Sequence, residues 1–181
     1  TQLEDSARAF LGVHFTNADR GWVVGGATIL ETTNAGKKWV TLFQESTYDL
    51  NGLWFMDGNR GVVVGSKGTI LRTTNGGMDW VRQTSDSVYA LRRVHFTDDN
   101  TGTAVGGDWY KGGIILRTTD GGNTWVTQLR YSEGSFNDVC FTDKDSGTVV
   151  GDALMLARGL IFRTTDGGKS WMRQVGDTYR E

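Results

Sequence analysis

The sequence predicts an all-β protein, a β-propeller of four-stranded antiparallel blades with four blades in the chain. Three features of its 181 residues support this fold: a turn ending in tryptophan recurs four times, a short β-branched run precedes each turn, and a strand ending in phenylalanine precedes each run. The tryptophans of the turn lie 41, 45 and 46 residues apart. Such a period, with four short strands in each unit, is typical of a propeller blade.

The first predicted strand of each unit carries apolar residues at every other position, as Val94 and Phe96 do, which indicates one buried face. Its copies read LGVHF at 11–15, LNGLWF at 50–55, LRRVHF at 91–96 and FNDVCF at 136–141. One position of this strand favours a role in packing, because it holds different residue types in the four copies: His14, Trp54, His95 and Cys140. The alternative is that these side chains line the central channel, since the first strand of a blade is usually the innermost.

The second predicted strand is a short β-branched run closed by glycine. Its copies read RGWVVGG at 20–26, RGVVVGS at 60–66, TGTAVGG at 101–107 and SGTVVGD at 146–152. The third strand, as in Ile115 to Arg117, alternates again, and turn-forming residues at 98–102 and 120–123 separate the strands of the third unit. The turn at 143–147 lacks the full ligand set of a calcium loop, so we interpret it as a plain turn.

The turn between the third and fourth strands ends in the repeated tryptophan, where the fourth strand is predicted to begin. It reads ETTNAGKKW at 31–39, RTTNGGMDW at 72–80, RTTDGGNTW at 117–125 and RTTDGGKSW at 163–171. An Asp or Asn side chain accepts hydrogen bonds within such a turn, glycine takes the positive φ of the reversal, and the indole packs beneath the hairpin. We therefore interpret eight residues as structural: Asn34, Trp39, Asn75, Trp80, Asp120, Trp125, Asp166 and Trp171.

These turns resemble Asp-box repeats, also called bacterial neuraminidase repeats. The combined unit VHFTDDNTGTAVGG…ILRTTDGGNTW is most similar to the photosystem II stability/assembly-factor family and its bacterial relatives. The resemblance covers residues from about 10 to 178. It implies a non-catalytic propeller that binds a protein partner, with the box as a hairpin staple away from the active face. It also favours an extracytoplasmic location, because relatives of the family are mostly exported.

Arginine precedes three of the four boxes, at Arg72, Arg117 and Arg163, where the first copy has Glu31. The family that the sequence resembles is known for an arginine-rich surface patch. Two interpretations therefore stay open. The arginines either pair with turn carboxylates as a structural element of each blade, or they form a patch that binds a ligand.

Enzymatic interpretations lack residues that they need, so the sequence predicts no catalytic residue and no enzyme. Sialidases share this repeat, but their active site requires an Arg-Ile-Pro motif, and this chain contains no proline. A xyloglucan-hydrolase-like site requires a cleft between two large propellers. The carboxylates of Asp120 and Asp166 belong to the boxes and are interpreted as structural.

Composition excludes further classes of function. The chain has 19 basic and 21 acidic residues, which disfavours binding to nucleic acid or to an anionic membrane, and no apolar run is long enough to insert into a membrane. The single cysteine, Cys140, excludes an internal disulfide and a cysteine-rich zinc site. Together with His14 and His95 it supplies only three candidate ligands, so we predict no metal and no cofactor.

Insertions between the second and third strands mark the predicted binding face. This connection is minimal in the second unit, at 65–68, and grows to 107–112 in the third and 152–159 in the fourth. Tryptophan, tyrosine and arginine are common at interface hot spots. The candidate binding residues are Trp109, Tyr110, Lys111, Leu154, Met155 and Arg158. The alternative is that these loops only cover the channel mouth or extend a hairpin.

The sequence leaves three functions open. The first is a protein-binding, assembly-factor-like module whose partner the sequence does not identify. The second is a propeller that binds a glycan or is related to glycoside hydrolases, with Trp109 and Tyr110 stacking on sugar rings. The third is a structural domain of a larger cell-surface protein.

We predict one propeller domain with a lead-in at 1–9 and blades at 10–46, 47–86, 87–132 and 133–178. Residues 1–3 resemble 127–129, which follow a box tryptophan, so the lead-in is interpreted as the end of a preceding blade. We expect the four blades to be a segment of a larger ring, cut from a longer protein or completed by self-association. A self-closed ring of four blades is the alternative.

Overall fold

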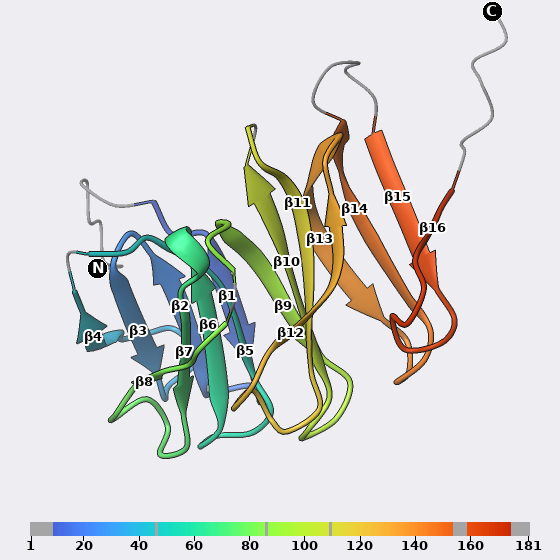
Figure 1. The fold of residues 1–181 in the computed structure, drawn as a ribbon. Coiled ribbons are helices and arrows are strands. Elements are labelled where there is room, and N and C mark those ends of the chain that lie inside the picture. Colours follow the sequence, from blue (N-terminus) through green and yellow to red (C-terminus); the bar gives the residue numbers. More distant parts are fainter. Residues whose placement is uncertain (1–8, 46, 86, 109, 154–158, 175–181) are drawn as a thin grey trace, which may run out of the picture.

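The structure is a computed structural model that describes residues 9–45, 47–85, 87–108, 110–153 and 159–174. The described residues form four sheets, each of four antiparallel strands, and one short 3₁₀ turn at Ser66–Gly68. The four sheets stand side by side like the blades of a fan (Figure 1). The predicted all-β fold of four-stranded blades is therefore confirmed. No helix in these residues is long and apolar enough to cross a membrane.

Each sheet is a meander in which neighbouring strands follow one another along the chain. The first sheet contains β1 (Gly12–Phe15), β2 (Gly21–Gly25), β3 (Thr28–Thr32) and β4 (Val40–Gln44); the second contains β5 (Leu50–Phe55), β6 (Gly61–Gly65), β7 (Ile70–Thr73) and β8 (Val81–Arg82). The third contains β9 (Leu91–Phe96), β10 (Gly102–Asp108), β11 (Gly112–Thr118) and β12 (Val126–Tyr131); the fourth contains β13 (Gly134–Phe141), β14 (Gly147–Ala153), β15 (Gly159–Thr164) and β16 (Met172–Arg173).

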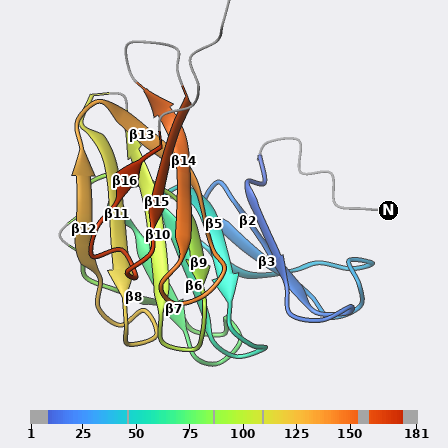
Figure 2. The same cartoon turned by 90° about the vertical axis from the view of Figure 1, so that its right-hand side faces the viewer.

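The first strands of neighbouring sheets contact one another: β1 contacts β5, β5 contacts β9, and β9 contacts β13. This places the first strand of each blade innermost and the fourth strand outermost. Extensive contacts between sheets join sheets that are adjacent in the chain, and the first and fourth sheets lie at the two ends of the array (Figure 1). In Figure 2 the fourth sheet faces the viewer.

One boundary differs from the prediction. The fourth strands begin one residue after the box tryptophan, at Val40, Val81, Val126 and Met172. The tryptophan itself is the last residue of the turn. Its ring packs edge-on against the phenylalanine that ends the first strand of its own blade, as in the Phe96–Trp125 pair with ring centroids 6.0 Å apart.

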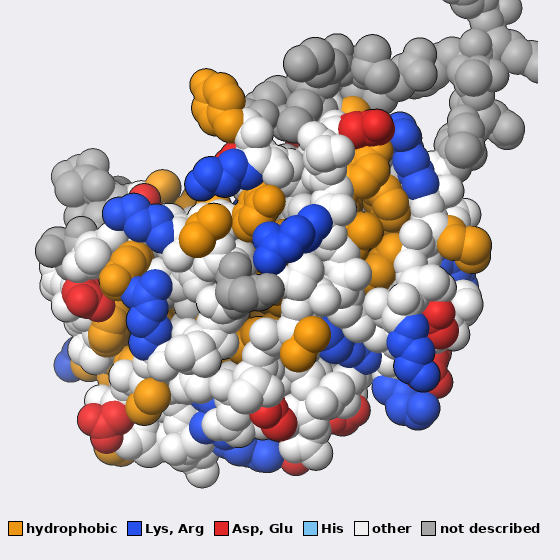
Figure 3. All heavy atoms as spheres, viewed as in Figure 1, with side chains coloured by type: hydrophobic (Ala, Val, Ile, Leu, Met, Phe, Trp, Pro, Cys, Tyr) orange, Lys and Arg blue, Asp and Glu red, His pale blue; other side chains and the backbone are white. Residues whose placement is uncertain are grey.

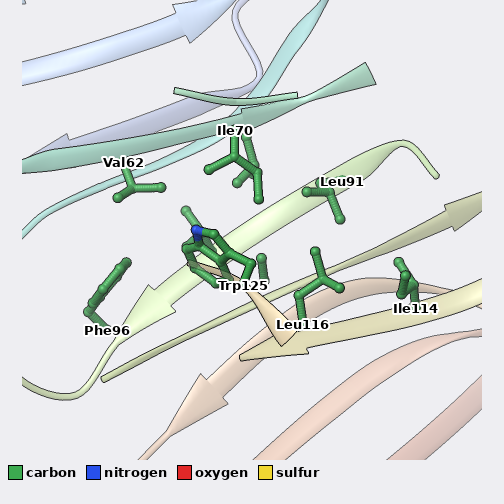
Figure 4. Close-up of a cluster of buried hydrophobic side chains, with 10 residues drawn as sticks. Val62, Ile70, Leu91, Phe96, Ile114, Leu116 and Trp125 are labelled. Atoms are coloured by element: carbon green, nitrogen blue, oxygen red, sulfur yellow. The ribbon is translucent and has the colours of Figure 1, made fainter. Parts of the chain in front are cut away.

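The hydrophobic core lies between the sheets. Trp22 from the first sheet stacks on Phe55 from the second, with ring centroids 3.7 Å apart and planes 6° from parallel. Between the second and third sheets, buried side chains from both sheets form one cluster (Figure 4): Val62, Val64, Ile70, Leu91, Val94, Phe96, Ala104, Ile114, Leu116 and Trp125. Burial of each such aliphatic or phenyl side chain contributes about 1.5–3 kcal/mol to the free energy of folding.

The glycines that begin and end the second strand have a packing reason. At Gly61 an added Cβ would lie 2.6 Å from a ring carbon of Phe55, and at Gly102 it would lie 2.7 Å from Phe96. At Gly106 an added Cβ would lie 2.0 Å from the carbonyl oxygen of Ala90, in the connection from the preceding blade. The glycines at both ends of this repeated motif therefore let the second strand lie directly against a phenyl ring and against the backbone of the connection.

Candidate functional site

The sheets have two ends with different chemistry. We call one end the box end; it contains the turns between first and second strands (16–20, 56–60, 97–101 and 142–146) and the four boxes (32–39, 73–80, 118–125 and 164–171). We call the opposite end the loop face; it contains the connections between second and third strands and those between sheets, described at 26–27, 47–49, 65–69, 83–85, 87–90, 110–112 and 131–134.

The four boxes share the bond from the threonine hydroxyl to the Asp or Asn Oδ1, the bond from the glycine amide to that hydroxyl, and the bond to Oδ1 from the amide before the tryptophan. In the third copy the hydroxyl of Thr118 donates to Oδ1 of Asp120 at 2.8 Å and accepts from the amide of Gly122 at 3.0 Å. Oδ1 of Asp120 also accepts from the amide of Thr124 at 2.9 Å, and its Oδ2 accepts from the Thr124 hydroxyl at 2.6 Å. The indole N–H of Trp125 donates to the carbonyl of Gly122 at 3.1 Å. Both carboxylate oxygens of this box are therefore engaged within its own turn.

These bonds hold the box carboxylates in the ionised form. The hydroxyl and amide of Ser170, with the hydroxyl of Thr164, lower the pKa of Asp166 to about 2. Burial raises the pKa of Asp120, but hydrogen bonds from Thr124 and Thr118 outweigh it, so that its pKa stays below the ordinary value. A carboxylate with a lowered pKa is a poor general acid at neutral pH.

The first two boxes use Asn in place of Asp with the same geometry. Oδ1 of Asn34 accepts from the amide of Lys38 at 2.8 Å, and Oδ1 of Asn75 accepts from the amide of Asp79 at 3.0 Å. Asn75 Nδ2 donates to Oδ2 of Asp79 at 2.8 Å. The tryptophans of these copies, Trp39 and Trp80, are half-buried, as is Trp171 in the fourth.

The arginines before the boxes point to the following blade where one exists. Arg72 Nε donates to the carbonyl of Gly121 at 2.8 Å, and Arg117 Nη2 donates to the carbonyl of Lys144 at 2.8 Å. Arg117 is buried, and its guanidinium lies 4.6 Å from the ring centroid of Phe141. These acceptors are main-chain carbonyls, whereas the sequence-based structural interpretation expected turn carboxylates. Arg163, on the last sheet, is exposed.

The variable position of the first strand forms a row across the inner edge. The ring centroid of Trp54 lies 4.6 Å from that of His14 and 4.6 Å from that of His95. Nδ1 of His14 accepts from the amide of Phe55 at 3.3 Å, and Nδ1 of His95 accepts from the amide of Phe141 at 2.8 Å. Each histidine thus joins its blade to the next one.

Burial lowers the pKa of both His14 and His95. The charge of His95 lowers the pKa of His14 further. At His95, the charge of Asp138 raises the pKa and that of Arg117 lowers it, but burial is the larger effect. A hollow of about 320 Å³ opens at the box end of this row, between His14, Trp54, Phe96 and Asp98. Cys140 is exposed, and within the described residues no group of three His, Cys, Asp or Glu side chains could hold a metal ion.

Of the predicted binding residues, the structure describes Tyr110 and Lys111, which lie on the loop face. Tyr110 is 98% exposed, and Lys111 beside it is exposed as well. Oδ1 of Asp108 shapes this loop by accepting from the amides of Tyr110 and Lys111 at 3.0 and 2.6 Å. Trp109, Leu154, Met155 and Arg158 lie outside the described residues.

Two arginine–tyrosine stacks lie on the same face. The guanidinium of Arg82 is 4.3 Å from the ring centroid of Tyr48, and that of Arg130 is 5.6 Å from the ring centroid of Tyr89. The hydroxyl of Tyr89 donates to the carbonyl of Lys111 at 3.3 Å, which ties the second stack to the exposed loop. In the space-filling view, Lys and Arg side chains lie among hydrophobic ones over the upper part of the molecule (Figure 3).

The family model of the photosystem II assembly factor YCF48 matches residues 2–87 and 41–180. The chain belongs to the YCF48 family. No curated protein matches its sequence.

Solved structures similar to this YCF48-family chain share its fold at low identity. YCF48 from Cyanidioschyzon merolae is 21% identical with a TM-score of 0.74, and the match covers 99% of this chain and 60% of that one. A YCF48 bound to D1 peptide is 18% identical with a TM-score of 0.56, covering 93% and 82%. The GH74 enzyme of Niastella koreensis is 15% identical with a TM-score of 0.71, covering 91% and 30%.

Sequence reasoning missed part of the basic surface of this YCF48-family chain. Arg92 and Arg93 are the second and third residues of β9, which begins at the loop face after the connection that carries Tyr89. Arg92 Nη1 donates to the side chain of Asn137 at 2.6 Å and so reaches the next sheet, whereas Arg93 Nη1 donates to the carbonyl of Asn51 at 3.0 Å in the preceding one. The doubled arginine at the start of one strand copy was the signal that could have revealed them.

Proposed function

We propose that this chain is a non-catalytic, protein-binding propeller of the YCF48 family that holds a segment of a client protein on its loop face. The observation that carries the proposal is the gathering of exposed Tyr110 and Lys111 with the Arg82–Tyr48 and Arg130–Tyr89 stacks at one end of the sheets. Tyrosine and arginine are among the side chains most enriched where protein interfaces concentrate their binding energy.

The chemistry of this face suits a peptide that presents carboxylates and apolar side chains. Guanidinium groups bind carboxylates through paired, charge-assisted hydrogen bonds. The stacked tyrosines offer flat apolar area next to those cations. A relative in the same family has been solved bound to D1 peptide. That relative supports a peptide as the ligand class here.

The box end supports the non-catalytic part of the proposal. The carboxylates of Asp120 and Asp166 are each held by hydrogen bonds from their own turns and lie on different sheets. An acid–base pair needs two carboxyl groups that face one substrate at short range.

Titration of a labelled D1 peptide, followed by fluorescence anisotropy, tests the proposal. The double variant Tyr110→Ala/Lys111→Ala should weaken binding at least about tenfold, which corresponds to roughly 1.4 kcal/mol. The matched control is Lys37→Ala/Met78→Ala, which removes one exposed lysine and one exposed apolar side chain from the box end and should bind like the parent. Equal weakening by both variants, or no binding by the parent, would refute the loop-face proposal.

Carbohydrate binding is the alternative function, favoured by the fully exposed ring of Tyr110 and by the shared fold with GH74 enzymes. Exposed aromatic rings can stack on sugar faces. Calorimetry with xyloglucan oligosaccharides separates the two functions, because the protein-binding proposal expects no heat of binding. A reducing-sugar assay with the same oligosaccharides should likewise show no hydrolysis. Binding of the oligosaccharide that disappears in Tyr110→Ala would favour the alternative instead.

A further inference from the structure

Two junctions between sheets contain the same hydrogen bond from a backbone amide to a histidine. The amide of Phe55 in β5 donates to Nδ1 of His14 in β1, and the amide of Phe141 in β13 donates to Nδ1 of His95 in β9. Phe55 and Phe141 hold the same repeat position, the last residue of the first strand. The bond is therefore built twice, between the first and second sheets and between the third and fourth.

These bonds fix the form of each imidazole ring. A ring nitrogen that accepts an N–H carries no proton, so each neutral ring carries its proton on Nε2. Protonation adds a hydrogen at Nδ1, where it would face the hydrogen of the phenylalanine amide. Two donors cannot form one hydrogen bond, so the charged ring has to turn away and leave the amide without this acceptor.

The junction between the second and third sheets is built without such a bond. The equivalent position in the second sheet is Trp54, and an indole nitrogen donates a hydrogen but does not accept one. The ring of Trp54 packs between those of His14 and His95 instead. Trp54 does not change its charge between pH 5 and pH 8, whereas a histidine on either side of it can.

The groups around His95 come from four strands. Trp54 on β5 and Thr103, opposite His95 on β10, carry no charge. Asp138 on β13 raises the pKa of His95 and Arg117 on β11 lowers it, but burial has the largest effect and brings the pKa below 6.5. The neutral ring that the Phe141 amide requires is thus the form that its surroundings favour.

The groups around His14 favour its neutral form as well. Trp22 lies opposite on β2 and Trp54 lies beside it on β5, and neither carries a charge. Burial lowers the pKa of His14 below 6.5, and the charge of His95 lowers it further. Both rings are half-buried, so that water can still deliver a proton to them.

The hollow at the box end gives a charged His14 ring somewhere to turn. His14 lines this hollow together with Asp98 and Asp99. Asp99 pairs with Arg60 at 2.9 Å. Burial raises the pKa of Asp98, but hydrogen bonds from the amides of Asn100 and Thr101 outweigh it and keep the pKa below its ordinary value. The carboxylate of Asp98 therefore remains charged while the histidines titrate.

We propose that His14 and His95 are acid-sensitive clasps, which join two pairs of neighbouring sheets at neutral pH and release both junctions when the rings are protonated. An unfolded histidine has its ordinary pKa of 6.5 and binds a proton more readily than either folded ring. The contribution of each clasp to stability is therefore present above pH 6.5 and is lost as the pH falls through the folded pKa. Carboxyl groups with ordinary pKa values titrate below this range.

Nitrogen-15 NMR of the full chain, labelled at its histidines, tests the clasps directly. At about pH 7.5 both rings should carry a proton on Nε2 and none on Nδ1. Each ring should then titrate with a midpoint below that of the same residue in the urea-unfolded chain. A proton on Nδ1 of either ring at this pH, or a midpoint at or above the unfolded one, overturns the proposal.

Urea denaturation of a double variant tests the effect on stability. His14→Asn/His95→Asn replaces each Nδ1 with an amide oxygen that accepts a hydrogen bond but does not titrate. The urea midpoint of the parent should fall between about pH 7.5 and about pH 5.5, and that of the double variant should stay level.

The matched control is His14→Phe/His95→Phe, which keeps flat rings in the row but removes the acceptors. Its urea midpoint should lie below that of the parent at about pH 7.5 and should also stay level on acidification. A parent midpoint that does not fall, or an asparagine variant whose midpoint falls as far as that of the parent, contradicts the clasps.

Discussion

The box end and the loop face differ in how regular their turns are. At the box end, four turns repeat the same hydrogen bonds, down to distances of 2.8–3.0 Å from the box glycine amide to the threonine hydroxyl. At the loop face, the connections differ from blade to blade: a tight 3₁₀ turn at Ser66–Gly68 in the second sheet, and an exposed loop carrying Tyr110 in the third. The repeated turns form the scaffold, and the divergent connections form the surface where we propose that a partner binds.

The largest effect expected is on the junctions that carry the scaffold. Phe55→Ala removes a ring that is 1% exposed and stacked on Trp22, so the free energy of unfolding should fall by about 3–5 kcal/mol. Phe15→Ala is the matched control, because Phe15 holds the same repeat position but is 41% exposed, and its loss should be less than half as large. Urea denaturation measures both. Equal losses would show that the junctions do not carry the stability.

This pair of phenylalanines shows where prediction from sequence stops. The repeat and its alternating pattern predict the strand, the buried face and the box bonds, because these depend on neighbours within one blade. They do not distinguish Phe15 from Phe55, because burial depends on whether another sheet covers the residue. The same limit applies to Arg72, whose acceptor is a main-chain carbonyl 49 residues away that leaves no mark in the sequence.

The loop face is harder to predict for a related reason. Lys111 and Tyr110 were predicted from an insertion that breaks the repeat. Arg82 and Arg92 come from strands of different blades and become part of one surface only when the blades pack side by side. A surface assembled from several blades leaves no local pattern in the sequence, whereas a turn that closes on itself does.

A smaller effect should follow from opening one box. Thr118→Val keeps the β-branched shape but removes the hydroxyl that donates to Asp120 and accepts from the amide of Gly122. Because Thr118 is 2% exposed, the unpaired amide should cost about 1–3 kcal/mol. Thr119→Val, at the exposed neighbouring position, should change stability by less than about 0.5 kcal/mol. Comparable losses for the two variants in urea denaturation would argue against the box as a staple.

The smallest effect expected is on the acid dependence of a box. The folded pKa of Asp166 is about 2, below its ordinary value of 3.8, because the Ser170 hydroxyl and amide and the Thr164 hydroxyl hold the carboxylate. An unfolded carboxyl therefore binds a proton more readily than the folded one, so its contribution to stability is present above its unfolded pKa and is lost as the pH falls through the folded value.

Thermal melting between about pH 5 and pH 2 measures this contribution. Asp166→Asn should flatten the fall in melting temperature across this window, because an amide does not titrate. Asparagine fits the turn, since Asn34 and Asn75 accept the same amide hydrogen bond in the first two boxes. Asp152→Asn is the matched control at the loop face, where the carboxylate accepts from Asn137 and no box is involved. If that control flattened the curve as much as Asp166→Asn, the acid sensitivity would belong to carboxylates in general. If only the box variant does so, the repeated turns are where acid in this window loosens the scaffold.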